Sequence, residues 1–228
     1  MHPFVAELSA ALQQASDGDR AIAMRAYMKD RCAFFGVPAE PRRLVQRTLK
    51  GPTDADLFVV ARELWRMDER EHQYAAIDLL TSRANKLEPS TLLGLVEELA
   101  RQRSWWDTVD GLASVASKCV LGHVEAPAFE SLVAITHRWL EDDDFWVVRL
   151  ALLHQKGWGP ATDAARLFRY SLRHAGDGEF FIRKAIGWAL RDYAWTNPDA
   201  VQQFVDDHGQ KLSGLTKREA LKNVKRVG

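Results

Sequence analysis

The sequence predicts an all-α protein in which pairs of antiparallel helices stack as an α-solenoid. Apolar residues recur every three or four positions, as Phe4, Leu8 and Leu12 do near the start of the chain. Similar segments also repeat, because Asp144-Phe-Trp-Val-Val-Arg is followed 35 positions later by Glu179-Phe-Phe-Ile-Arg-Lys. A period of about 35–40 residues with two helices in each unit is typical of HEAT-like repeats, whose stacks curve and leave a concave groove.

The predicted helices can be followed in order by their apolar faces and end signals. After the first helix, Thr53-Asp-Ala-Asp opens another with a capping residue and early acids, and residues 57–64 form its apolar face. Residues 77–84 repeat the helical spacing, and Asn197-Pro-Asp opens a helix near the C-terminus. Helix ends are expected at Gly51, Gly122 and Gly176. The pattern predicts roughly a dozen helices of about 10–18 residues joined by short loops.

Length and composition indicate one folded domain with a substantial core. The 228 residues are 46% hydrophobic and 27% charged, which excludes the disordered and low-complexity classes. No linker rich in Pro, Gly or Ser interrupts the chain, so a single domain over residues 1–228 is expected. Because 31 basic and 31 acidic residues leave a formal net charge of zero, any surface for nucleic acid must be local.

Several environments and chemistries are not expected. The two cysteines, Cys32 and Cys119, suit a reducing cytoplasm, and the start of the chain lacks the features of a signal peptide. Charges such as Arg149 break every long apolar stretch, so no membrane span is predicted. Zinc-protease, paired-cysteine, phosphate-loop and serine-hydrolase motifs are missing, and the histidines are scattered. The sequence therefore predicts neither a metal nor an organic cofactor.

Three predicted helical segments place aromatic residues beside charges. Trp106 and Asp110 are four positions apart and share one helix face, whereas Trp105 is expected to point into the core. Trp146 and Arg149 are three positions apart and are likewise neighbours. One face of the third segment carries Phe181, Lys184, Trp188, Arg191 and Trp195.

These segments allow a structural and a functional interpretation. Solenoid helices often bury aromatic residues between repeats, and a nearby charge then only neutralises a neighbour. The functional interpretation is favoured because the pattern occurs three times, and three stacked segments could line one shared surface. Indole faces attract cations and pack on sugar rings, and a carboxylate such as Asp110 would stabilise a developing positive charge. The combination suits a substrate that is, or becomes, cationic.

Two basic clusters could hold an anionic backbone. The first contains Arg42, Arg43, Arg47 and Lys50, and the second runs from Lys217 to Arg226. Each cluster could equally be a solvated helix face. A neutral chain with separated basic clusters is compatible with a groove that faces DNA and an acidic back.

Taken together, these segments resemble the AlkD-type DNA alkylation-repair glycosylases. The likeness runs in order from the first residue to nearly the last, and its most specific blocks are Ser104-Trp-Trp-Asp-Thr-Val-Asp, Phe180-Phe-Ile-Arg-Lys-Ala-Ile-Gly-Trp and Leu215-Thr-Lys-Arg-Glu-Ala. The resemblance implies a HEAT-like solenoid that holds double-stranded DNA in a basic concave groove. It also implies excision of cationic N3- and N7-alkylated purines, such as 3-methyladenine and 7-methylguanine, without metal or cofactor.

The resemblance also assigns residues to roles. Trp106 and Asp110 match the catalytic tryptophan and aspartate, and Trp188 matches the second tryptophan. Arg149 matches an arginine that supports the site and contacts the DNA backbone. The expected DNA contacts are Tyr27, Arg43, Lys184, Arg191, Lys217 and Arg218. The family is thought to act without swinging the damaged nucleotide into a pocket.

Two positions depart from the family pattern, and two other functions stay open. Pro38 replaces a polar amide after the Phe-Gly pair, and Gly157 replaces a lysine, although Lys156 lies beside it. The alternatives are a non-catalytic HEAT-like scaffold and a protein that binds damaged DNA without cutting it. In every case a monomer in the cytoplasm is expected.

Overall fold

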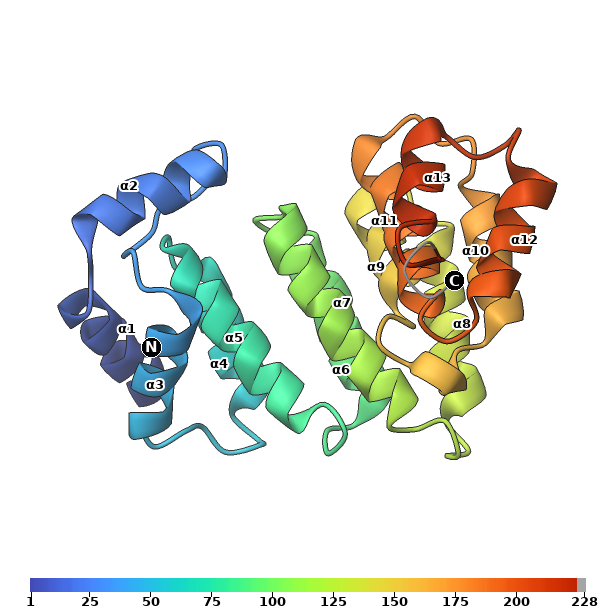
Figure 1. The fold of residues 1–228 in the computed structure, drawn as a ribbon. Coiled ribbons are helices and arrows are strands. Elements are labelled where there is room, and N and C mark those ends of the chain that lie inside the picture. Colours follow the sequence, from blue (N-terminus) through green and yellow to red (C-terminus); the bar gives the residue numbers. More distant parts are fainter. Residues whose placement is uncertain (225–228) are drawn as a thin grey trace. The chain divides into compact units, whose positions relative to one another are not determined.

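The computed structural model describes residues 1–224, and these residues are almost entirely helical (Figure 1). They form thirteen α-helices and one short 3-10 helix, without a β-strand, so the predicted all-α class is confirmed. Within residues 1–224, one isolated β-bridge joins the backbones of Ala33 and Glu69. Lys225 and Arg226 of the C-terminal basic cluster lie outside the described residues.

The chain divides into two compact units, Met1–Arg83 and Ala84–Gly228, and the expected single domain stays a prediction. The first unit contains α1 (Pro3–Gln14), α2 (Gly18–Tyr27), α3 (Ala39–Thr48), α4 (Leu57–Arg66) and α5 (Arg70–Arg83). Its core lies largely between α4 and α5, which pack against each other, and α1 and α3 cover them. By contrast, α2 contributes no buried residue.

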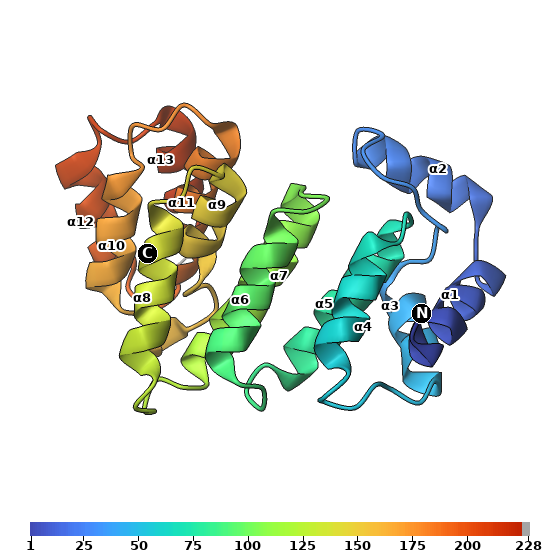
Figure 2. The same cartoon turned by 180° about the vertical axis from the view of Figure 1, so that it is seen from behind.

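The second unit is a succession of helix pairs. It contains α6 (Pro89–Ala100), α7 (Trp106–Leu121), α8 (Phe129–Leu140), α9 (Phe145–Leu153), the 3-10 helix Gly159–Ala161, α10 (Ala164–Arg173), α11 (Phe180–Tyr193), α12 (Pro198–His208) and α13 (Gly214–Ala220). Consecutive helices pair, and α7, α9, α11 and α13 form a row in which each packs on the next (Figures 1 and 2). This arrangement is solenoid-like, as predicted, whereas a concave DNA-binding groove stays a prediction.

Helix starts follow local capping chemistry. Asn197 accepts a hydrogen bond from the Ala200 amide at 3.0 Å, which confirms the start predicted for α12. The start predicted at Thr53 is wrong by three residues, because the N-cap of α4 is Asp56 and the helix begins at Leu57. There the Thr53 hydroxyl donates to the Asp56 carboxylate at 2.6 Å and closes a turn before the helix begins.

The predicted helix ends agree with the observed ends to within a few residues. Gly122 is the C-terminal cap of α7, as expected. Helices α3 and α10 end at Thr48 and Arg173, and their C-caps, Leu49 and His174, lie two positions before the predicted glycines. Differences of this size are normal because helix ends fray.

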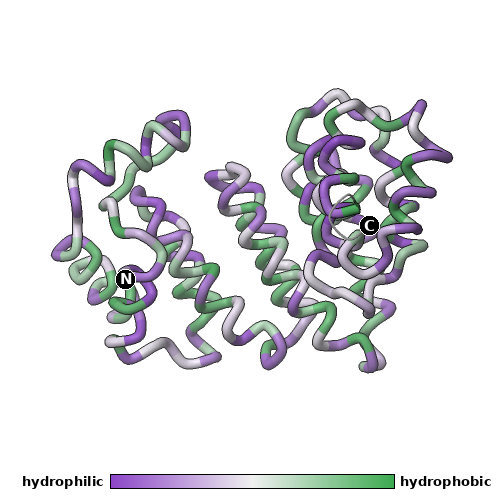
Figure 3. Tube along the Cα trace, viewed as in Figure 1, coloured by the Kyte–Doolittle hydropathy of each residue, from purple (hydrophilic) through white to green (hydrophobic). Residues whose placement is uncertain are grey.

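Helix α9 is the most enclosed element of the second unit. Its residues Trp146 to Leu153 are all buried, because α7, α8, α10 and α11 pack around it. Elsewhere hydrophilic and hydrophobic residues alternate along the helices, as Figure 3 shows for α5 and α7. Among the described residues, no helix has both the length and the apolarity that crossing a bilayer requires.

Candidate active site

A buried arginine holds a partly exposed carboxylate in the second unit. Arg149 donates from Nε to Oδ1 of Asp110 at 2.7 Å and from Nη2 to Oδ2 at 3.0 Å. The arginine side chain is 1% exposed and the aspartate side chain is 17% exposed. A bidentate pair of this kind fixes the plane of the carboxylate as well as its charge. Asp110 therefore presents an oriented anion at the surface of this unit.

The remaining contacts of Arg149 tie this pair to α11. Its Nη1 donates to the main-chain oxygen of Phe181 at 2.5 Å. Its guanidinium carbon lies 5.2 Å from the centre of the Trp188 ring and 6.0 Å from that of Phe181. One side chain of α9 thus connects the carboxylate of α7 with the aromatic face of α11.

The first turn of α7 carries the predicted tryptophan and aspartate. Trp106 is the first residue of the helix, Asp110 follows one turn later, and both side chains are half-buried. Trp105 is the N-terminal cap in extended conformation, so its side chain leaves on a different side from that of Trp106. The two residues expected to share a face therefore do share one.

Trp105 belongs to an aromatic cluster beside the Asp110–Arg149 pair. Its ring lies edge-on to Phe181 at 5.1 Å and to Trp146 at 6.0 Å between ring centres. Phe145 contacts both Trp146 and Phe181. Carboxylate caps hold the two contributing helices, since Asp144 accepts from the Trp146 amide and Glu179 accepts from the Phe181 amide. Such edge-to-face packing fixes the ends of α7, α9 and α11 relative to one another.

Cations surround the ring of Trp188. Measured to the ring centre, Arg149 lies at 5.2 Å, Lys184 at 5.4 Å, Arg191 at 5.6 Å and Lys156 at 5.9 Å. Each distance is within the range of a cation–π contact. On the face predicted for α11, Lys184, Trp188 and Arg191 therefore do lie together. Trp195 lies beyond the end of the helix and is 58% exposed.

Position 157, where the resemblance leads us to expect a lysine, is a glycine in a left-handed conformation. Gly157 has a φ of +85°, and its amide donates to the Asp192 carboxylate at 2.6 Å. This left-handed conformation suits glycine. Lys156, immediately before it, is the residue that reaches Trp188. The sequence places Lys156 beside the departing position but does not by itself assign it to the site.

Helix α13, which packs on α11, carries the basic residues Lys217 and Arg218. Arg218 is exposed, and Lys217 donates to the main-chain oxygen of Gly209 at 3.1 Å. With Leu221 and Lys222 they line a hollow of about 390 Å³. A cationic hollow with an apolar floor can receive a phosphate and its sugar.

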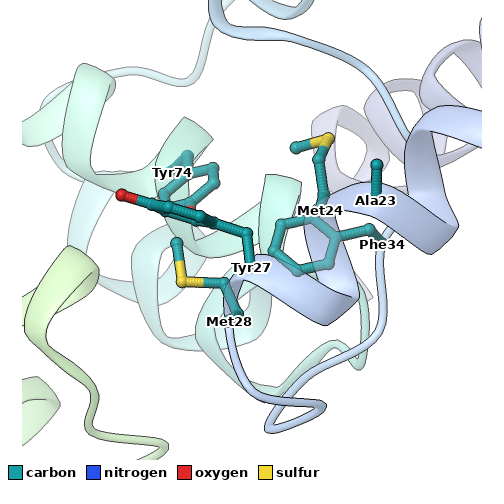
Figure 4. A pocket seen from close by; sticks show the side chains of 6 residues that line it. All are labelled: Ala23, Met24, Tyr27, Met28, Phe34 and Tyr74. Atoms are coloured by element: carbon teal, nitrogen blue, oxygen red, sulfur yellow. The ribbon is translucent and has the colours of Figure 1, made fainter.

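Two predicted DNA contacts belong to the first unit. Tyr27 is 70% exposed and borders a hollow of about 270 Å³. Figure 4 shows the rings of Tyr27 and Tyr74 near each other on one side of this hollow, and Met24 and Phe34 on the other. These side chains make an apolar, aromatic surface on α2 and α5.

Arg43 is already engaged by acids. Its guanidinium pairs with Asp78 at 3.3 Å and Glu40 at 3.2 Å, and the Asp78 carboxylate is the main cause that raises the pKa of Arg43. Arg42, adjacent in sequence, is buried and pairs with Asp78 at 3.0 Å. The first basic cluster is therefore partly neutralised, and Arg43 as a phosphate contact stays a prediction.

The loop that carries Pro38 is fixed by a buried carboxylate. Glu71 accepts hydrogen bonds from the amides of Phe35, Gly36 and Val37 at 2.9–3.1 Å. Gly36 has a φ of +85°, and a Cβ there would lie 2.1 Å from the main-chain oxygen of Asp17. Only glycine fits this approach.

The chain is similar over nearly all of its length to a known protein family and to a solved structure. The family model described as "DNA alkylation repair enzyme" matches residues 8–224. A solved structure described as "Predicted DNA alkylation repair enzyme from Enterococcus faecalis" is 29% identical, with a TM-score of 0.82, and the match covers 91% of this chain and 95% of that one. No curated protein matches the chain. A match that spans nearly all of the sequence shows that this chain belongs to the family of DNA alkylation repair enzymes.

Proposed function

We propose that the protein is a monofunctional DNA glycosylase that removes cationic N3- and N7-alkylated purines from double-stranded DNA. Membership of the family supports a role in the repair of alkylated DNA. The observation that carries the finer proposal is the partly exposed carboxylate of Asp110, which the buried Arg149 orients beside tryptophan and basic side chains. We further propose that the protein acts as a monomer in the cytoplasm, at the nucleoid.

The proposed reaction requires a negative charge that stabilises the transition state rather than an acid that protonates the leaving base. An alkylated purine such as 3-methyladenine or 7-methylguanine already carries positive charge and leaves readily once the N-glycosidic bond stretches. The deoxyribose then acquires oxocarbenium character, as in other glycosidic cleavages. Asp110 would stabilise this charge and orient the attacking water. Arg149 occupies one acceptor site on each carboxylate oxygen, and each oxygen has a second site for water or sugar.

The tryptophans would contact the sugar, and the cations around Trp188 would contact the phosphates. Trp106, one turn before Asp110, would pack on the deoxyribose and favour its cationic character by about 0.5–2 kcal/mol. Trp188 would do the same from α11, while the cations around it, Lys156, Lys184 and Arg191, would hold the flanking phosphates. Neither a scaffold nor a damage-binding protein requires a carboxylate oriented at such a surface.

Release of free base is the direct test. Duplex DNA methylated to contain 3-methyladenine and 7-methylguanine is incubated with the protein, and the soluble products are separated by chromatography. We expect both free bases from the wild-type protein, and release slowed by about 10²–10³-fold in a D110N variant that still binds the same DNA. Binding without release by the wild-type protein would favour a damage-binding protein, and failure to bind DNA would favour a scaffold.

A further inference from the structure

Glu219 of α13 is a buried carboxylate at the centre of the basic residues around Trp188. Its Oε1 lies 2.7 Å from Nζ of Lys222 and 3.8 Å from Nζ of Lys184, and its Oε2 accepts from Nη1 of Arg191 at 2.9 Å. The glutamate side chain is 7% exposed. Lys184 and Arg191 are also two of the cations that lie over the Trp188 ring. One anion therefore contacts two of the groups that surround this indole.

The approach of α13 to α11 depends on a glycine opposite Glu219. A Cβ added to Gly187 would lie 2.5 Å from Cβ of Glu219 and 3.0 Å from the main-chain oxygen of Thr216. Because real Cβ atoms do not come this close, any side chain at position 187 would displace α13. Gly187 directly precedes Trp188, so the glycine sets the distance between Glu219 and the indole's neighbours.

Hydrogen bonds from the residues before and after Glu219 fix its position along the axis of α11. The Thr216 hydroxyl donates to the main-chain oxygen of Arg183 at 3.0 Å, and the Asn223 amide donates to that of Arg191 at 2.8 Å. Thr216, Glu219 and Asn223 are all buried. These three side chains follow the helical spacing of one face, and their partners on α11 do the same. The register of the two segments is therefore set by side chains rather than by loops.

We propose that Glu219 is a positioning residue for DNA repair, which holds Lys184 and Arg191 on either side of Trp188 so that the flanking phosphate and the reacting sugar meet Asp110 in register. This inference rests on the proposed glycosylase function. Glu219 acts through the two cations and need not touch the DNA. The negative charge of Glu219 also partly neutralises Lys184 and Arg191, and so weakens their attraction to phosphates elsewhere on the duplex.

Electrostatics keep the Glu219 carboxylate charged in this buried place. Burial raises the pKa of Glu219, but the ion pairs with Lys222, Lys184 and Arg191 outweigh burial, and the pKa lies below its ordinary value. Without this anion, the three cations would repel one another and move apart. Loss of the charge would thus loosen the site and at the same time release cations for nonspecific contacts with DNA.

A single substitution should therefore change excision and binding in opposite directions. For E219Q, we expect the single-turnover rate of base release to fall about 10–100-fold, because small misplacements near a reacting centre cost this much. Affinity for undamaged duplex should rise a few-fold, and the slope of log affinity against log salt should steepen by about one. A merely structural defect would weaken excision and binding together.

Glu97 offers a matched control in the same unit. Its carboxylate accepts from Arg101 at 2.9 Å, from Arg138 at 2.7 Å and from the Trp139 indole at 2.7 Å. E97Q thus removes an anion that holds two arginines and raises the net charge by one, as E219Q does. We expect wild-type excision and an unchanged salt slope for E97Q. Equal effects of the two substitutions would overturn the assignment to Glu219.

G187A tests the same idea without a change of charge. The added methyl group must push α13 away from α11, while alanine itself suits a helix. We expect excision by G187A to fall at least several-fold, and circular dichroism to show a folded protein. Wild-type excision by either G187A or E219Q would overturn the proposal.

The two proposals fail in different ways. If the wild-type protein releases no base, the glycosylase function is wrong, and the binding measurements then decide the role of Glu219. If E219Q binds undamaged duplex no more tightly than E97Q does, with no steeper salt slope, Glu219 does not control these cations. If the wild-type protein releases base and E219Q releases it equally fast, the positioning role alone is wrong.

Discussion

Arg149 on α9 and Asp110 on α7, 39 positions apart in the sequence, form a bidentate ion pair in which the arginine is buried and the aspartate is not. The third nitrogen of the guanidinium donates to the Phe181 main-chain oxygen. Because Nε, Nη1 and Nη2 are all engaged, the arginine is held in one orientation and transmits it to the carboxylate. The pair thereby joins α7, α9 and α11 at the position where chemistry is proposed.

Replacement of Asp110 should separate chemistry from binding. We expect D110N to lower the single-turnover rate of base release by about 10²–10³-fold, a typical cost of losing an electrostatic catalytic group. Affinity for undamaged duplex should stay within a few-fold of wild type. The asparagine amide would face donors of Arg149, so the free energy of unfolding should also fall by about 1–3 kcal/mol, and the assay must run well below the melting temperature. Near-full excision by D110N would remove Asp110 from the mechanism.

The stability of the pair can be measured by a double-mutant cycle. R149M leaves the Asp110 carboxylate and the Phe181 carbonyl without their donor, whereas D110N leaves the guanidinium without its acceptor. Because both substitutions break the same contact, D110N should cost less in the R149M background than in the wild type, with a coupling of about 0.5–3 kcal/mol. Chemical denaturation of the four proteins gives this value. Additive effects would show that the contact contributes nothing to folding.

Helical spacing was sufficient to predict the fold class and the local pairs. Trp106 and Asp110 lie one turn apart on α7, and Lys184, Trp188 and Arg191 share a face of α11, as their spacing predicts. Such relations depend only on the geometry of one helix. The start of α4 was predicted wrongly because Thr53 caps a turn, and a turn uses the same residues as a helix start.

Contacts between helices could not be predicted from spacing. Trp146 and Arg149 are three positions apart on α9 and both contact Phe181, but their spacing does not reveal that Arg149 also pairs with Asp110 on α7. The direction of a long side chain depends on which helix lies opposite, and this is a tertiary property. Glu219 was missed for the same reason, because in sequence it is only an acid inside a basic segment.

The cations of α13 should be measurable through the salt dependence of DNA binding. Each phosphate contact contributes about 0.9 to the slope of log affinity against log salt. We expect K217A and R218A each to reduce the slope by roughly one unit, and R43A to reduce it by less, because Arg43 is already paired with Asp78 and Glu40. R173A is the matched control, since Arg173, at the end of α10, pairs with Glu141 after α8. Slopes unchanged in the α13 variants would place the DNA elsewhere.

A buried histidine makes stability depend on acid pH. Burial lowers the pKa of His154 from 6.5 to about 4, because a second proton would enter the apolar interior, and the hydrogen bond between its Nδ1 and the Ala151 carbonyl at 2.6 Å opposes this shift only in part. The unfolded chain takes up this proton near pH 6.5 and the folded chain does not. His154 therefore costs no stability above pH 7, and as pH falls from 6.5 to 4 the free energy of unfolding decreases by up to about 3 kcal/mol.

Variant H154Q isolates this contribution. Buried His72, whose pKa burial also lowers, is retained in both proteins and contributes equally to each. Urea denaturation between pH 7.5 and 4.5 should show a smaller loss of stability for H154Q than for the wild-type protein. Parallel curves would show that His154 is protonated in the folded state.

Selectivity for charged lesions tests the mechanism most directly, because the site offers an anion and indoles rather than an acid aimed at the base. Cationic 3-methyladenine and 7-methylguanine should be released, whereas neutral uracil and hypoxanthine in the same duplex should stay attached, since they require protonation to leave. W106A and W188A should each slow release of the cationic bases, and the two together should cost a few kcal/mol in transition-state stabilisation. The measurement is single-turnover release from duplexes that differ in one base. Efficient release of a neutral base would mean that a proton donor acts at this site, and selection by the charge of the substrate would then be wrong.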